Sequence, residues 1–138
     1  MRNAGILLPI SALPSPYGIG AMGRAARDFI QFLAEAGHSC WQILPIGPTS
    51  YGDSPYQSVS AYAGNPYFID LDDLAEEGLL EPSEYWSVDW GTRPDEIDYG
   101  LLYARRYPVL RRACDRLLAE ESEDYDRFCR EQSLWLED

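Results

Sequence analysis

The hydrophobic pattern in the first third of the chain predicts a strand, a helix and a second strand. The apolar run "AGILLPI" (residues 4–10) is interrupted by a proline and is typical of a strand buried on both faces. From Ala21 onward, apolar residues recur at spacings of four and three, which predicts an amphipathic helix that ends at Gly37. The run from Cys40 to Leu44 predicts a second buried strand. Together they predict a right-handed βαβ unit with parallel strands. The apolar helix positions are Met22, Ala26, Phe29, Leu33 and Ala36.

The second half of the chain predicts helices joined by irregular segments. Residues 72–80 predict a short helix and residues 81–98 an irregular acidic stretch, followed by a helix over 99–121 that Pro108 interrupts or kinks. Ser122 is a suitable cap for a last helix that begins at Glu123 and still continues at the final "WLED". We therefore divide the chain into a βαβ unit with binding loops (1–70) and an acidic, mostly helical segment that is incomplete at its C-terminus (71–138).

Two long loops follow the two predicted strands, at residues 11–20 and 45–68. Because parallel strands direct the loops at their C-terminal ends to one edge, we expect both loops on the same face, where α/β proteins bind ligands. The second loop contains "YGDSPYQSVSAYAGNPYF" (51–68), with four tyrosines, a phenylalanine, two prolines and two glycines. Rings beside short polar groups suit a sugar, which has apolar faces and hydroxyl rims. The alternative is a loop whose aromatic residues only cover a core.

Charge and composition exclude several classes of protein. The 138 residues, 46% of them hydrophobic, have the length and composition of a globular domain. The net charge of −12 is concentrated in residues 71–138, with eight arginines against nineteen acids, which disfavours nucleic acid as a partner. No run approaches the ~20 apolar residues of a membrane span and no signal-peptide pattern is present, so we expect a cytoplasmic protein without a membrane partner. Three cysteines and one histidine provide neither a disulfide framework nor a metal site.

Two further patterns in the sequence bear on its chemistry. "GIGAMG" (18–23) has the G-x-G-x-x-G spacing of dinucleotide-binding loops, but a proline-bearing insert separates it from the strand and no acid ends the second strand. Glycines that permit a tight turn into the helix are the preferred interpretation. Asp53 and Asp70 are the acids near the binding face. We expect Asp53 to accept hydrogen bonds from hydroxyls or loop amides and Asp70 to cap the next element.

Three strings carry a resemblance to a known family: "RNAGILLPISALPSPYGIG", "WQILPIGPTSYGDSPYQSVSAYAGNPYFIDLDDL" and "FCREQSLWLED". They resemble the N-terminal part of the 4-alpha-glucanotransferases (amylomaltases, or disproportionating enzymes) of glycoside hydrolase family 77. The resemblance implies an α/β fold that is the truncated start of a (β/α)8 TIM barrel. It also implies a cofactor-independent transferase of starch and maltodextrin metabolism. Such an enzyme transfers 1,4-α-glucan segments to glucose or another glucan by a retaining mechanism, with maltooligosaccharides as partners.

The resemblance also assigns binding residues but no catalytic ones. Its sugar-contacting loop matches "GDSPYQ", and the family's catalytic carboxylates, which lie on later barrel strands, have no counterpart in these 138 residues. We therefore expect the chain alone to be inactive. The implied substrate-binding residues are Asp53, Ser54 and Tyr56 for the donor-side sugar, Gln57 and Asn65 for positioning the loop, and Tyr51 for glucan away from the reaction centre.

Length agrees with this interpretation, since a complete barrel takes ~250 residues and only its first two strands are recognisable here. Three hypotheses stay open: an N-terminal part of a glucanotransferase, a free-standing glucan-binding module without catalysis, and a small nucleotide-binding α/β protein that uses "GIGAMG". A reading frame that continues into a barrel with acids at its strand ends would select the first. A stop codon with a cooperatively folding product would favour the second hypothesis. Protection of the chain by NAD but not by maltooligosaccharide would favour the third.

Overall fold

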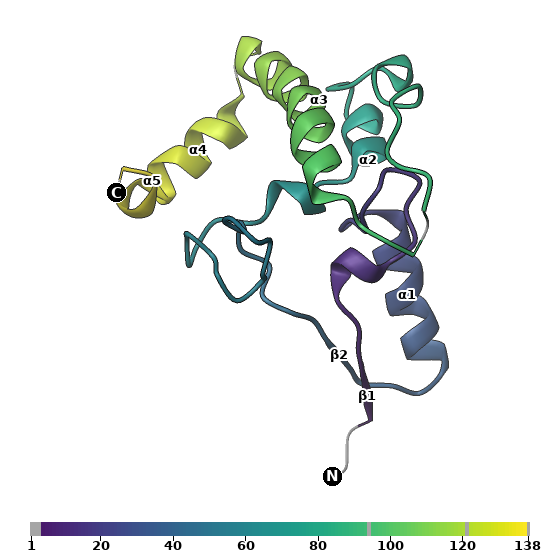
Figure 1. The fold of residues 1–138 in the computed structure, drawn as a ribbon. Coiled ribbons are helices and arrows are strands. Elements are labelled where there is room, and N and C mark those ends of the chain that lie inside the picture. Colours follow the sequence, from purple (N-terminus) through teal and green to yellow (C-terminus); the bar gives the residue numbers. More distant parts are fainter. Residues whose placement is uncertain (1–3, 94, 121, 138) are drawn as a thin grey trace.

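The computed structural model of the protein describes residues 4–93, 95–120 and 122–137, and it begins with the predicted βαβ unit (Figure 1). Strands β1 (Gly5–Leu7) and β2 (Cys40–Gln42) pair in parallel, with Gly5 opposite Cys40. Helix α1 (Arg24–Glu35) connects them. The βαβ prediction is therefore confirmed. The later elements are α2 (Leu71–Glu76), α3 (Tyr99–Ala119), α4 (Glu123–Glu131) and α5 (Ser133–Leu136), with 3-10 turns η1 (Ile10–Ala12), η2 (Pro66–Phe68) and η3 (Pro82–Glu84).

Helix α1 follows the predicted apolar spacing but begins three residues later than predicted. Ala26 and Leu33 are buried, and the Phe29 ring packs edge-on against Trp41 of β2 at a centroid distance of 5.0 Å. Met22 lies before the helix and is exposed. Gly37 ends the helix with a φ of +76°, a left-handed conformation that glycine adopts without a steric penalty.

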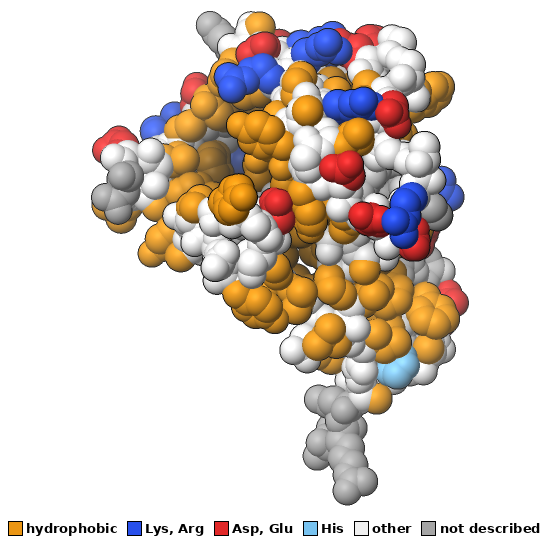
Figure 2. Space-filling model, in the orientation of Figure 1, with side chains coloured by type: hydrophobic (Ala, Val, Ile, Leu, Met, Phe, Trp, Pro, Cys, Tyr) orange, Lys and Arg blue, Asp and Glu red, His pale blue; other side chains and the backbone are white. Residues whose placement is uncertain are grey.

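Both strands are shorter than predicted, and the prediction that they are buried on both faces is wrong for the described residues. Ile6 and Trp41 are half-buried, whereas their neighbours along each strand are exposed, Leu7 to 57%. Helix α1 packs on the side of the Trp41 ring, and the described part of the chain places no second layer on the opposite face. Figure 2 shows hydrophobic side chains exposed over this part of the molecule.

The main core joins residues from both halves of the chain. The Asp72 carboxylate on α2 accepts hydrogen bonds from the hydroxyls of Tyr17, at 2.7 Å, and Tyr85, at 2.8 Å. The irregular stretch after α2 has little regular structure, as predicted, but it buries Tyr85 and Trp90. Its role is therefore to fill the core between the first loop and α3. The buried members of this cluster are Tyr17, Ile19, Tyr67, Leu71, Leu80, Tyr85, Trp90, Leu102, Val109 and Ala113.

Side-chain caps fix where the later helices begin. The Asp70 carboxylate accepts hydrogen bonds from the backbone N–H groups of Asp72 and Asp73 at the start of α2, and the Ser122 hydroxyl accepts one from Tyr125 at the start of α4. Both caps were predicted, and both are confirmed.

Two helix predictions for the second half differ from the structure. Helix α3 continues through Pro108, so the predicted interruption is wrong, and the kink there stays a prediction. The last helix does not run on to the end of the chain, because Gln132 leaves helical geometry between α4 and α5 and its side chain accepts a hydrogen bond from the Trp135 indole. No helix within the described ranges combines the length and the apolar character needed to cross a membrane.

Candidate functional site

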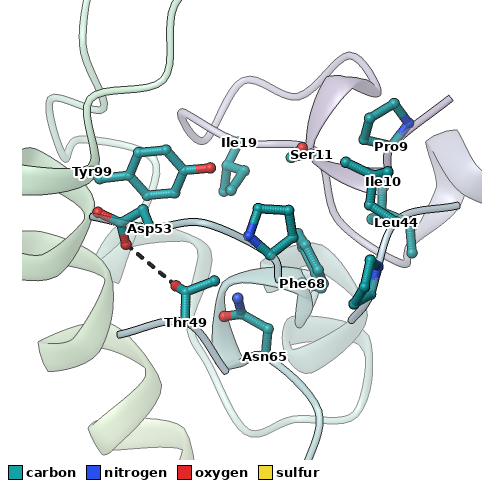
Figure 3. A pocket seen from close by; sticks show the side chains of 12 residues that line it. Pro9, Ile10, Ser11, Ile19, Leu44, Thr49, Asp53, Asn65, Phe68 and Tyr99 are labelled. Atoms are coloured by element: carbon teal, nitrogen blue, oxygen red, sulfur yellow. Dashed lines mark hydrogen bonds between the residues drawn. The ribbon is translucent and has the colours of Figure 1, made fainter. Parts of the chain in front are cut away.

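The two loops that follow β1 and β2 enclose a cavity of about 110 Å³, closed by η2 and by the first residue of α3 (Figure 3). Residues 9–11 and 44–45 reach it directly from the C-terminal ends of the two strands. The prediction that both loops lie on one face is therefore confirmed. We call this space the strand-end cavity, and its lining residues are Pro9, Ile10, Ser11, Ile19, Leu44, Pro45, Thr49, Asp53, Pro55, Asn65, Phe68 and Tyr99.

Asp53 is the acidic residue that lines the cavity. Its backbone has a φ of +51°, an uncommon conformation for a residue other than glycine, and its N–H donates to the Ser50 carbonyl at 3.0 Å. The Thr49 hydroxyl donates to the Asp53 carboxylate at 3.3 Å, the bond drawn in Figure 3. The expectation that Asp53 accepts a hydrogen bond from a hydroxyl is confirmed. Since a carboxylate can accept several hydrogen bonds, Asp53 has capacity left for a ligand hydroxyl.

Tyr99 forms the wall of the cavity beside Asp53, and its hydroxyl points toward the middle of the space (Figure 3). Burial, and then the negative charge of Asp53, raise the pKa of Tyr99. Behind it, burial and the neighbouring Tyr107 raise the pKa of Tyr67 to about 12. The Tyr99 phenol therefore stays protonated at neutral pH and can donate a hydrogen bond.

Asn65 anchors the end of the second loop. It is 7% exposed, its side-chain oxygen accepts a hydrogen bond from the Tyr67 N–H at 3.0 Å, and its own N–H donates to the Ile46 carbonyl at 2.8 Å. Asn65 thus caps η2 and joins the two ends of the loop while lining the cavity.

The other four predicted binding residues lie outside the cavity lining. Tyr56 is 73% exposed and lies in a neighbouring open groove of about 350 Å³, which shares Pro45 and Pro55 with the cavity. Ser54 is half-buried and its hydroxyl accepts a hydrogen bond from the Tyr56 N–H at 3.4 Å. The Gln57 backbone forms hydrogen bonds within the loop, and Tyr51 is fully exposed. The structure therefore gathers Asp53 and Asn65 at the cavity and Tyr56 beside it.

Sequence reasoning missed three polar residues of the cavity. Ser11 and Thr49 stand in the two loops already identified, so their position near the strand ends was a usable signal. Tyr99 had no such signal, because it comes from the first turn of α3 and reaches the cavity only through tertiary packing. With Asp53 and Asn65, these residues provide hydroxyl, carboxylate and amide groups in a largely apolar space.

The glycines of "GIGAMG" serve close packing. A side chain at Gly20 would clash with the Ile10 carbonyl, and one at Gly23 would clash with the Asp70 carboxylate. Asp70 therefore lies where α1 begins, the position that a bound phosphate would need in a dinucleotide site. This arrangement supports the interpretation of these glycines as a tight turn.

Within the described residues, no three His, Cys, Asp or Glu side chains lie close enough together to hold a metal ion.

Comparison with known proteins gives consistent matches to one family. Residues 8–138 match the model of glycoside hydrolase family 77, described as 4-alpha-glucanotransferase. The chain is 49% identical over 137 residues to a 4-alpha-glucanotransferase of Streptococcus pneumoniae serotype 4, and 50% identical over 141 residues to one of Thermus thermophilus. Each alignment covers 99% of this chain and 27% of the relative.

A solved structure agrees with these matches. The amylomaltase from Streptococcus agalactiae in complex with acarbose superposes with a TM-score of 0.91 at 42% identity, covering 96% of this chain and 27% of that one. The chain therefore spans about a quarter of the length of the relatives it matches.

Proposed function

Since this chain belongs to the 4-alpha-glucanotransferases of glycoside hydrolase family 77, as its sequence strings predicted, we propose that it is the N-terminal, substrate-binding part of such an enzyme. The enzyme transfers a segment of a 1,4-α-glucan to glucose or to another glucan. The observation that carries the proposal is the cavity at the ends of two parallel strands, where Asp53, Asn65 and Tyr99 meet.

The chemistry of the cavity suits a glucosyl unit. A pyranose has an apolar C–H face and a hydroxyl rim. Apolar side chains and the Tyr99 ring accommodate the face, and the Asp53 carboxylate and the Ser11 hydroxyl can bond the rim. Tyr56, in the adjoining groove, provides a further exposed ring for a neighbouring unit. Ser54 accompanies Tyr56, Gln57 and Asn65 position the loop, and Tyr51 binds glucan farther out.

The remaining parts of the proposal concern the complete enzyme. Strands β1 and β2 are the first two of a (β/α)8 barrel, in which 1–70 is the first βαβ unit and 71–138 an acidic, mostly helical segment. Later strands supply the nucleophile and the acid/base carboxylate of a retaining mechanism, with a covalent glycosyl-enzyme intermediate. The enzyme needs no cofactor and acts on maltooligosaccharides in the cytoplasm, without nucleic acid or membrane as a partner.

The test uses a hybrid enzyme in which residues 1–138 replace the matching segment of the Streptococcus pneumoniae relative. We expect the hybrid to fold and to convert maltotriose into glucose and longer oligosaccharides. A hybrid that does not fold, or that folds and neither binds nor converts maltotriose, would contradict the proposal. A folded hybrid that binds maltotriose without converting it would favour the free-standing glucan-binding module instead.

Asp53→Asn in the hybrid tests the cavity itself. Asparagine tolerates positive φ and preserves the shape of the side chain, so the substitution removes the charge with little effect on the loop. We expect kcat/KM for maltotriose to fall about tenfold or more, the scale of one charge-assisted hydrogen bond. The matched control is Asp28→Asn on α1, an exposed carboxylate paired with Arg24, which should leave kcat/KM unchanged.

A further inference from the structure

Arg106 is a fully buried arginine on α3 whose hydrogen bonds go to backbone carbonyls. Its side chain has no exposed surface. One terminal nitrogen donates to the Tyr17 carbonyl at 3.2 Å, and the other donates to the Ile69 carbonyl at 2.7 Å. The guanidinium carbon lies 5.9 Å from the centroid of the Trp90 ring. The third nitrogen, Nε, is buried without a partner among the described residues.

Such a placement is costly for a cation. Burial lowers the pKa of Arg106 to about 10, and the negative charge of Asp70 offsets only part of that effect. At neutral pH the side chain is still charged. Because a buried cation is costly and a complete buried ionic group can often be replaced by apolar residues without loss of stability, stability alone does not require an arginine at this position. Its position relative to the cavity offers a different account.

The two carbonyls that Arg106 holds belong to the two segments that frame the strand-end cavity. Tyr17 lies two residues before Ile19, and Ile69 directly follows Phe68; both Ile19 and Phe68 line the cavity. Next to the cavity, a hydrogen bond from the Met22 N–H to the Phe68 carbonyl, at 2.8 Å, also joins these two segments. A planar guanidinium that donates to both segments fixes their spacing and direction together.

We propose that Arg106 is a positioning residue: it clamps the Tyr17 and Ile69 backbone segments and thereby sets the width of the strand-end cavity for a glucosyl unit. This inference rests on the proposed function, since the cavity is taken as the sugar site. Arg106 does not line the cavity itself and acts through the two segments it holds. Losing it frees two carbonyls and allows the frame to shift, and a small shift in a binding site is sufficient to weaken binding.

The test is Arg106→Met in the hybrid enzyme, with Arg116→Met as the matched control. Arg116 lies on the same helix and also donates a hydrogen bond to a backbone carbonyl, that of Leu79. It serves as a control because neither Arg116 nor Leu79 lines the cavity. We expect Arg106→Met to raise KM for maltotriose by about fivefold or more while kcat changes less. Arg116→Met should leave KM unchanged. Melting temperatures of both variants are measured on the same preparations.

Three outcomes would separate the interpretations. If Arg106→Met lowers the melting temperature and leaves KM within twofold of the unsubstituted hybrid, Arg106 has only a structural role and the inference is overturned. If that variant does not fold, Arg106→Lys, which keeps the charge but not the planar fork, must show a raised KM; an unchanged KM would overturn the inference. An unsubstituted hybrid without transfer activity would refute the proposed function instead.

Discussion

Tyr56→Ala in the hybrid enzyme separates sugar binding from loop packing. The Tyr56 ring is 73% exposed and lies beside Pro45 and Pro55. A ring that only packed the loop would be mostly covered. An exposed ring beside a cavity is available to the C–H face of a pyranose.

The exposed fraction sets the expected magnitudes. Burying a whole aromatic side chain contributes roughly 1.5–3 kcal/mol, so the quarter of Tyr56 that is covered contributes less than about 1 kcal/mol to folding. Loss of a ring that stacks on a sugar should cost about 1–3 kcal/mol of transition-state binding, or roughly 5- to 150-fold in kcat/KM. The effect on catalysis should therefore exceed the effect on stability.

The assay measures kcat/KM for maltotriose and the melting temperature on one preparation of each variant. Tyr56→Phe keeps the ring and should retain most of the activity, unless the hydroxyl donates to the sugar. The matched control is Tyr103→Ala on α3, because Tyr103 is 71% exposed and lies outside both the cavity and the Tyr56 groove. Unchanged kinetics with a lowered melting temperature for Tyr56→Ala would refute the assignment of this ring to the sugar site.

Four further predictions concern stability and the chain by itself. Asp70→Ala removes the cap of α2 and should destabilise the hybrid by about 1 kcal/mol in urea unfolding, whereas Asp70→Asn, which can still cap but no longer offsets the charge of Arg106, should destabilise it less. Burial and the hydrogen bond to Asp72 raise the pKa of Tyr85 from 10 to about 12. The stability from Tyr85 is therefore present below pH 10 and lost as the pH rises toward 12, and Tyr85→Phe should flatten this loss. The isolated 138 residues should aggregate or lack a sharp thermal transition, because the two-stranded sheet is open on one face. They should also release no product from maltotriose above a buffer control.

The features that were predictable from the sequence are those that depend on neighbouring residues. The βαβ unit follows from short apolar runs and a helical spacing, and the caps at Asp70 and Ser122 need only the next three residues. The position of Asp53 on the face of the strand-end loops was predictable, because its loop follows a strand. Burial of the strands was not predictable in the same way, since an apolar strand is covered only where another layer packs on it.

The features that the sequence did not predict depend on contacts between distant segments. Tyr85 and Trp90 lie in a stretch without periodicity, yet both are buried, because the core they complete is formed by Tyr17 and α3. Tyr99 marks only the beginning of a helix in the sequence. No local pattern distinguishes the buried Arg106 from the more exposed Arg105 and Arg111 on the same helix.

Helix α3 explains why a site formed by the strand-end loops also depends on the second half of the chain. Tyr99 and Arg106 are seven positions apart, or about two helical turns, so they lie on the same side of the helix. The first forms a wall of the cavity, and the second holds the backbone segments that frame it. The irregular stretch before α3, anchored in the core by Tyr85 and Trp90, brings the helix to that position. Because one rigid element provides both contacts, a displacement of α3 changes the wall and the frame together.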